Sequence, residues 1–182
     1  MAFRILAVAG SLRQGSYNRA LIRAAAELAP EGVVIEVYDL KGFPEYNAEN
    51  ESPIPSKAAE FKAKIRAADA LLIATPEYNH SFPGVLKNAL DWASRPSGDN
   101  AWSGKVAGIM SASTGMLGGF RAQNHLRGTF VYLNVESVNK PEVMVSFAAE
   151  KIKDGRLVDE KARELIRQLI IAVQAKALKL RP

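Results

Sequence analysis

The 182-residue chain contains no cysteine. Disulfide bonds, thiolate metal ligands, cysteine nucleophiles and redox-active dithiols are therefore excluded. Histidine is also scarce: His80 and His125 are the two in the chain, too few for a histidine-rich metal centre. If this protein transfers electrons, a bound cofactor has to carry them.

Long apolar runs are absent as well. No segment approaches the about 18 consecutive apolar residues that a membrane-spanning helix needs. The first residues, 1–5, lack the basic segment, long apolar stretch and cleavage site of a secretory signal peptide. Hydrophobic residues make up 48% of the chain and charged residues 24%, which allows a sizeable core. We therefore expect a soluble, cytoplasmic protein without membrane association.

The charge balance is modestly basic. The net charge is +5, from 24 Lys and Arg against 19 Asp and Glu. A positive field of this size favours anionic ligands such as nucleotides. The basic residues form no dense run and many belong to solvent-facing sides of helices, so we expect no nucleic-acid partner.

Short apolar runs alternate with segments of helical spacing along the chain. Runs typical of buried strands cover residues 4–10, 33–38, 70–75, 106–110 and 135–138. Helices are expected over 18–29 and about 56–68, after Pro83-Gly84, around Leu126–Leu133 and along Leu165–Leu180. This alternation predicts an α/β fold with a parallel sheet covered on both faces. Right-handed crossovers make it a doubly wound, flavodoxin-like five-stranded sheet of order 2-1-3-4-5. We expect one domain over residues 1–182.

In this topology ligands bind beyond the carboxyl ends of the strands. The loop after the first strand reads Gly10-Ser11-Leu12-Arg13-Gln14-Gly15-Ser16-Tyr17-Asn18. Its glycines permit a tight turn, its small polar side chains and free helix-start N–H groups attract an anion, and Arg13 adds a positive charge. The loop lacks the P-loop lysine and the G-x-G-x-x-G pattern, so it predicts a single phosphate site.

Two alternatives concern this phosphate region. An ordinary helix cap, with Ser16 as the capping residue, also explains the loop. Asp39, at the end of the second strand, resembles a ribose-binding acid, although we favour a plain surface position for it.

Two further loops fall on the same sheet edge. In Pro76-Glu77-Tyr78-Asn79-His80-Ser81-Phe82-Pro83-Gly84, the backbone amides and Asn79 suit the edge of a flat heterocycle, and Tyr78 and Phe82 suit its faces. The alternative is a turn with buried aromatics; His80 is either a substrate contact or without a role. Ser111–Arg121 contains Gly115, Gly118 and Gly119, which let a ring approach the backbone unless they form only a flexible loop. Together the three loops predict a mononucleotide with a large base.

Three motifs carry a family resemblance. GSLRxGSxN after the first strand, TPEYNxSxPGxLKNAxDW after the third and GxxGGxRxQxxLR after the fourth resemble the NADPH-dependent FMN reductase family, which includes quinone, chromate and azo-dye reductases. The resemblance runs from residue 4 to about 144 and includes Asn139-Lys140-Pro141-Glu142.

The resemblance implies FMN as cofactor and NADPH or NADH as electron donor. The FMN phosphate would be held by Ser11, Arg13, Ser16, Tyr17 and Asn18. The isoalloxazine would be lined by Pro76, Glu77, Tyr78, Asn79, Ser113 and Gly115. His80 and Thr114 stand at variable positions of the pattern, which leaves the acceptor open.

The implied reaction is ping-pong: hydride passes from the nicotinamide to the flavin, and the reduced flavin then reduces a quinone, free flavin, azo compound or chromate. The scheme needs no protein nucleophile, so no catalytic acid or base is assigned. The alternatives are a flavodoxin-like electron carrier without its own NAD(P)H reaction, which the positive charge disfavours, and a nucleotide-binding regulatory module.

The resemblance also implies a homodimer or homotetramer with FMN near an interface between subunits. Aromatic residues and arginine are enriched in interface cores. We expect Phe82, Phe120 and Arg121 at such an interface, and we place Tyr78, Trp92 and Trp102 in or near the same group. The alternative is that most of these aromatics belong to the core of the chain, Trp92 above all because it lies on an expected helix.

Overall fold

The computed structural model describes residues 2–180; Met1, Arg181 and Pro182 of the expected domain lie outside the described residues. Its six-stranded sheet has the order β2-β1-β3-β4-β5, with β6 also paired to β4. Every pairing in this sheet is parallel. The strands are β1 Phe3–Ala9, β2 Val33–Tyr38, β3 Ala70–Ala74, β4 Val106–Ala112, β5 Glu136–Ser137 and β6 Val143–Val145. The predicted flavodoxin-like strand order is confirmed.

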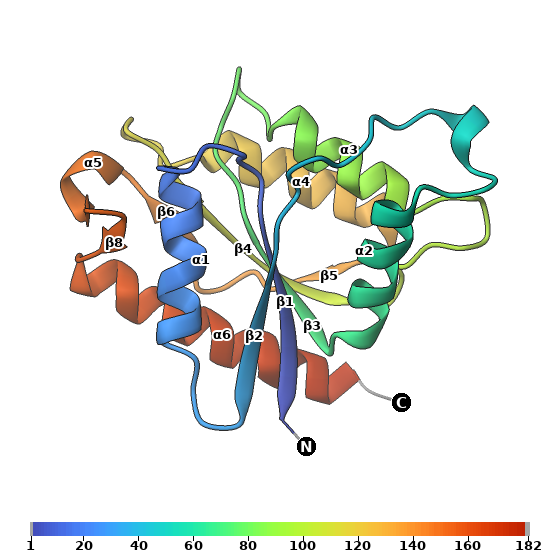
Figure 1. Ribbon diagram of the computed structural model, residues 1–182. Helices are drawn as coiled ribbons and strands as arrows, with labels where there is room; N and C mark the ends of the chain where they lie inside the picture. The colour runs from blue at the N-terminus through green and yellow to red at the C-terminus, as the bar shows by residue number, and fades with distance from the viewer. Residues whose placement is uncertain (1, 181–182) are drawn as a thin grey trace.

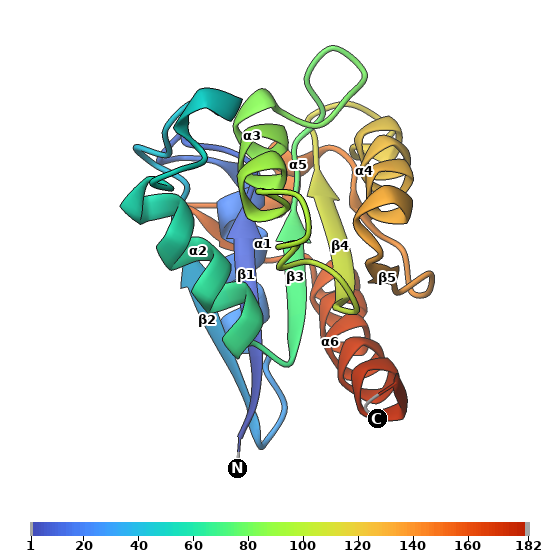
Figure 2. The same ribbon diagram turned by 90° about the vertical axis from the view of Figure 1, so that its right-hand side faces the viewer.

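Helices cover both faces of the sheet (Figures 1 and 2). On one face lie α1 (Tyr17–Glu27) and α6 (Glu160–Leu180), and on the other α2 (Ser56–Ala67), α3 (Gly84–Ala93) and α4 (Phe120–Leu133). β3 is buried along its whole length, because alternate residues enter the two cores: Leu72 packs with α1 and α6, and Leu71 and Ile73 with the other helices. None of the helices in residues 2–180 combines the length and apolar character needed to cross a membrane.

At the fifth strand position, where a single strand over 135–138 was expected, the structure has two short strands. β5 pairs with the first residues of β4, and after a break β6 pairs with its last residues, from Met110 opposite Val143. Within the break, Pro141 has no N–H to donate to a sheet ladder, and the Arg127 guanidinium binds the Val138 carbonyl and the Asn139 side chain instead. β6 therefore continues the sheet to its carboxyl edge, behind the loop that follows β4.

Between β6 and α6 the chain forms elements that were not predicted. These are the short helix α5 (Ala148–Lys151) and the antiparallel hairpin of β7 (Ile152–Lys153) and β8 (Arg156–Leu157). Elsewhere, a 3-10 turn, η1 (Ala48–Asn50), forms between β2 and α2. The hairpin turns through Asp154-Gly155, both with positive φ. An Asp-Gly pair is the usual signal of such a turn, but its flanking strands are too short to show an alternating pattern.

The expectation that Trp92 and Trp102 lie at an interface is wrong. Both side chains are buried, with 0% and 1% exposure. Their indole N–H groups donate inside the chain, to the Pro44 and Leu90 carbonyls respectively. Tyr78 and Phe120 are exposed, and Phe82 is partly buried against the α2–α4 core.

Candidate functional site

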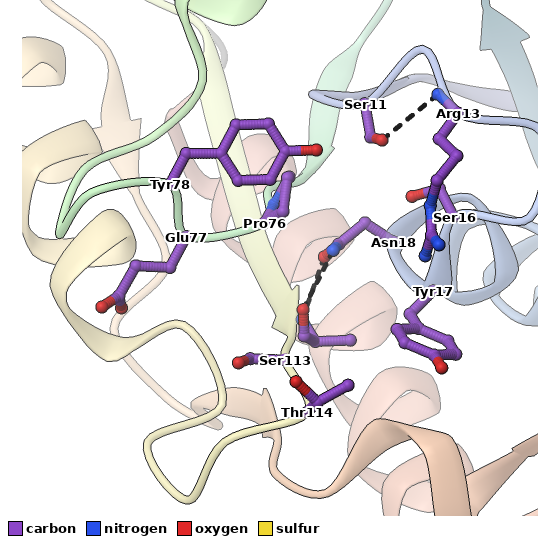
Figure 3. A pocket seen from close by; sticks show the side chains of 11 residues that line it. Ser11, Arg13, Ser16, Tyr17, Asn18, Pro76, Glu77, Tyr78, Ser113 and Thr114 are labelled. Atoms are coloured by element: carbon purple, nitrogen blue, oxygen red, sulfur yellow. Dashed lines mark hydrogen bonds between the residues drawn. The ribbon is translucent and has the colours of Figure 1, made fainter.

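A cavity of about 210 Å³ lies beyond the carboxyl ends of β1, β3 and β4 (Figure 3). It is lined by Ser11, Arg13, Ser16, Tyr17, Asn18, Pro76, Glu77, Tyr78, Ala112, Ser113 and Thr114. The three loops singled out in the sequence therefore meet at one place. Of the predicted residues, Asn79 and Gly115 are not part of the cavity lining, whereas Ala112 and Thr114 are lining residues that the motifs did not assign.

The loop after β1 is organised by its own neighbours. Ser16 caps α1 by accepting a hydrogen bond from the Arg19 N–H at 3.4 Å, and the Ser11 hydroxyl accepts one from the Arg13 N–H at 3.4 Å. Within residues 2–180, the backbone N–H groups of Leu12, Gln14, Gly15 and Tyr17 have no acceptor. Free N–H groups gathered at a helix start form a binding place for an anion.

Arg13 supplies the positive charge of this region. Its guanidinium carbon lies 5.5 Å from the centre of the Tyr17 ring, a cation–π contact. In the part of the chain that the structure describes, the guanidinium has no hydrogen bond or ion pair. Figure 3 shows both side chains on the same wall of the cavity. Arg13 is thus held in place while its N–H donors stay available to a ligand.

Asn18 joins two elements of the site. Its Nδ2 donates to the Ala112 carbonyl at 3.0 Å, and its Oδ1 accepts from the Ala112 N–H at 2.9 Å. The side chain is buried, at 2% exposure. Asn18 therefore fastens the start of α1 to the end of β4, and its predicted contact with a phosphate stays a prediction.

The loop after β3 closes into a tight hairpin. Tyr78 and Ser81 exchange backbone hydrogen bonds of 2.8 and 2.9 Å, with Asn79 and His80 at φ 49° and 64° between them. These left-handed residues form an exposed tip, and neither is part of the cavity lining. Pro76, Glu77 and Tyr78 remain as the cavity wall.

Glu77 connects this loop to α4. Its carboxylate accepts hydrogen bonds from the Arg121 backbone N–H at 3.1 Å and from the Arg121 guanidinium at 3.3 Å. Glu77 is mostly shielded, with 13% of its side chain exposed, whereas 43% of the Arg121 side chain is exposed. The ion pair balances the carboxylate charge beside the cavity.

Asp39 lies outside this cavity, in a neighbouring hollow with Gln14 and Arg19. Burial alone would raise the pKa of Asp39, but hydrogen bonds from the Lys41 N–H and the Arg19 guanidinium, with the positive charge of Arg19, lower it overall. The Arg19–Asp39 pair spans 2.5 Å. A carboxylate already engaged in this way favours the surface interpretation over a ribose-binding acid.

The comparisons with known proteins agree with this geometry. A model of the NADPH-dependent FMN reductase family matches residues 3–150. The chain belongs to this family. It is 51% identical to an NAD(P)H-dependent FMN reductase of Pseudomonas aeruginosa over 180 residues, 98% of this chain and 97% of that protein. It is 45% identical to a 2-hydroxy-1,4-benzoquinone reductase of a Burkholderia species over 167 residues, 91% of each.

A solved structure extends the comparison. The flavoenzyme NAD(P)H:(acceptor) oxidoreductase FerB of Paracoccus denitrificans superposes with a TM-score of 0.89, at 31% identity and 98% coverage of both chains. Membership of the family makes this chain an oxidoreductase that uses FMN and NAD(P)H.

The residues of the cavity fit FMN. Among the described residues, one end offers N–H groups without an acceptor and a guanidinium without an ion pair, as a single phosphate requires. The other end offers the aromatic Tyr78 and the small residues Ala112 and Ser113, as a flat ring requires. The cavity of about 210 Å³ is smaller than the roughly 300–1,000 Å³ typical of ligand pockets, so a mononucleotide would be only partly enclosed.

Proposed function

We propose that this FMN-dependent oxidoreductase takes electrons from NADPH or NADH and passes them to small quinones, as one cytoplasmic domain over residues 1–182. The observation that carries the proposal is the meeting of a phosphate-suited loop and two ring-suited loops at one partly open cavity. The names of the relatives, which include a benzoquinone reductase and NADPH:quinone oxidoreductases beside an FMN reductase, support quinones over azo compounds or chromate as acceptors.

The proposal assigns roles to the cavity residues. The phosphate is bound by the loop after β1, through Ser11, Arg13, Ser16, Tyr17 and Asn18. The ring is lined by the other two loops, through Pro76, Glu77, Tyr78, Asn79, Ser113 and Gly115. Bound FMN supplies the hydride-accepting and electron-donating chemistry. The side chains bind and orient it, and no catalytic acid or base is needed among them.

The test is a pair of measurements on purified protein. FMN should bind more tightly than riboflavin, because riboflavin lacks the phosphate. Oxidation of NADPH and NADH should depend on an added quinone, with ferricyanide and free FMN as comparison acceptors. Equal affinity for FMN and riboflavin would contradict the phosphate site. FMN binding without NAD(P)H oxidation would instead favour a flavodoxin-like electron carrier.

We also propose that the chain forms a homodimer or homotetramer through the exposed face of α4, with Phe120 and Arg121 on it and Phe82 nearby. Phe120, Val131 and Tyr132 are 44%, 82% and 80% exposed. Gly128 lies between them, and nothing lies within 4 Å of where its Cβ would be. A mid-helix glycine costs about 1 kcal/mol relative to alanine, and a close approach of a second helix would explain it.

Light scattering on Tyr132→Glu tests this interface without changing the cavity lining, since Tyr132 is exposed and is not one of the lining residues. The variant should dissociate at concentrations where the unmodified protein stays assembled. Arg121→Glu should also loosen the assembly. A monomeric protein with full specific activity would contradict the proposal.

A further inference from the structure

A buried polar connection lies behind the loop that follows β4. Gln123 of α4 is 2% exposed, and its Nε2 donates to the Ser111 hydroxyl at 2.8 Å and to the Val143 carbonyl at 2.9 Å. The Ser111 hydroxyl, fully buried on β4, donates in turn to the Gly118 carbonyl at 2.6 Å. The Gln123 amide thus joins α4 to β4 and β6. The Ser111 hydroxyl in turn joins β4 to the loop through the Gly118 carbonyl.

The direction of these hydrogen bonds is fixed by the partners. The Val143 carbonyl can only accept, so the amide must present its nitrogen on this side. Ser111 then accepts from that nitrogen, and its single hydroxyl hydrogen is left for the Gly118 carbonyl. Gln123 therefore determines which way the Ser111 hydroxyl points.

The loop sits directly on Ser111. Gly118 and Gly119 have φ 58° and 93°, and a Cβ on Gly119 would lie 2.6 Å from the Ser111 Cβ. Two consecutive glycines allow the peptide between them to face either way, because no side chain restricts it. The hydrogen bond from Ser111 selects the orientation in which the Gly118 carbonyl points into the protein.

A similar arrangement recurs along most of the loop. Five of its carbonyls accept hydrogen bonds from the protein: Ser113 from the Ala148 N–H, Gly115 from the Phe147 N–H, Met116 from the Ser146 hydroxyl, Leu117 from the Phe120 N–H and Gly118 from the Ser111 hydroxyl. Among residues 2–180, no acceptor takes the N–H groups of Thr114, Met116 or Leu117. The loop therefore turns acceptors inward and leaves donors free.

We propose that Gln123 and Ser111 are positioning residues for the flavin ring: by holding the Gly118 carbonyl inward, they keep the N–H groups of Thr114, Met116 and Leu117 available to the ring edge that gains negative charge on reduction. This inference rests on the proposed placement of the ring at this loop. Neither side chain belongs to the cavity lining, so both act through the loop.

The experiment uses Gln123→Met and Ser111→Ala. Methionine keeps the unbranched shape of glutamine but donates no hydrogen bond, and alanine removes only the hydroxyl. We expect FMN to bind about tenfold more weakly to each variant, the worth of one hydrogen bond. Inorganic phosphate should bind to the FMN-free variants as it does to the unmodified protein, because the loop after β1 is untouched.

The reduction potential gives a second readout. If the N–H groups favour reduced FMN, the variants should lose about tenfold more affinity for reduced than for oxidised FMN. That corresponds to a midpoint potential lower by about 30 mV for a two-electron couple. A general loss of folding would not produce this difference, since both redox forms would be affected alike.

Asn88 provides the matched control. Its side chain also makes two backbone hydrogen bonds, from Nδ2 to the Pro44 carbonyl and from the Tyr46 N–H to Oδ1, both 2.7 Å, and so fastens a loop that contributes no residue to the cavity lining. Asn88→Leu should lower the unfolding temperature of the FMN-free protein but leave FMN affinity, phosphate affinity and potential unchanged.

The outcomes distinguish failure of the proposed function from failure of the positioning role. Failure of the unmodified protein to bind FMN would overturn the proposed function. FMN binding by the unmodified protein with unchanged affinity and potential in both variants would overturn the positioning role. Loss of phosphate binding together with FMN binding would overturn it too, because the residues would then support the fold in general. If Gln123→Met does not fold, Ser111→Ala decides.

Discussion

The loops after β1 and after β4 face the same cavity but are built in opposite ways. In residues 11–17, the hydrogen bonds that shape the turn join close neighbours, such as Ser11 with Arg13 and Ser16 with Arg19. In residues 113–119, most of the partners come from other elements, including Ser111 of β4 and the segment 145–148. The first loop depends on local sequence, whereas the second depends on the completed fold. Substitutions should therefore be tolerated better in the first.

The largest expected difference is between two glycines. Gly119→Ala places a Cβ 2.6 Å from Ser111 at φ 93°. Left-handed strain and overpacking together should lower the free energy of unfolding by about 2–4 kcal/mol. Gly15→Ala meets nothing within 4 Å and needs no positive φ, so it should stay within about 1 kcal/mol of the unmodified protein. Urea unfolding of the FMN-free proteins measures both, and equal losses would remove the contrast.

A second prediction concerns Arg13, the free cation of the first loop. Arg13→Ala should weaken FMN binding roughly ten- to a hundred-fold, since a charge-assisted hydrogen bond is worth about 1.5–3 kcal/mol. Unfolding should be unaffected, because the guanidinium contacts only the Tyr17 ring in the described chain. Arg13→Lys, which keeps the charge, should recover part of the affinity at low salt. Unchanged FMN affinity in Arg13→Ala would place the phosphate elsewhere.

Ser16 separates helix capping from phosphate binding. Ser16→Ala removes the helix cap and should lower the free energy of unfolding by about 1 kcal/mol. The affinity for FMN should fall as well, because the hydroxyl proposed to bind the phosphate is also removed. Ser16→Asp should retain the cap but place a negative charge beside the phosphate, so stability should stay and FMN affinity should fall. Thermal unfolding and FMN titration distinguish these results. Tight FMN binding by Ser16→Asp would support the plain helix-cap interpretation of this loop.

The smallest effect is expected at Asp39, outside both loops. Its pKa is lowered in the folded protein, so its contribution to stability is present above the pKa of the unfolded chain and is lost as the pH falls through the folded-state pKa. Asp39→Asn should cost at most about 1 kcal/mol at neutral pH, as for other exposed ion pairs. The difference should vanish in acid, and the KM for NAD(P)H should not change. A raised KM would return Asp39 to the ribose-binding role.

The same contrast explains what the sequence could predict. The strands β1, β3 and β4 and the capped start of α1 follow from local apolar runs and from Ser16, so their prediction succeeded. β6 has three residues and is specified by its pairing with β4, which no local pattern reveals. The Gln123–Ser111 contact likewise joins residues whose motif positions gave no sign of it.

Side-chain direction was the other unpredictable feature. Asn79 lies at an exposed hairpin tip, because Tyr78 and Ser81 exchange backbone hydrogen bonds on either side of it, and its contact with the ring stays a prediction. Trp92 and Trp102 looked like surface anchors because they flank the loops, yet each turns its ring into the core. Spacing along the chain predicts which elements meet, whereas the direction of each side chain depends on the packing around it.

The division of the fifth strand position also bears on how the protein behaves in crowded solution. An exposed sheet edge can add strands from other chains and so begin aggregation, and long uncharged edges carry the greatest risk. Here one edge is split into β5 and β6, of two and three residues. On the opposite edge, Glu36 in the middle of β2 holds Arg4 at 3.5 Å and Lys64 at 2.5 Å. Each edge is thus protected against chain-to-chain strand addition, one by interruption and the other by charge.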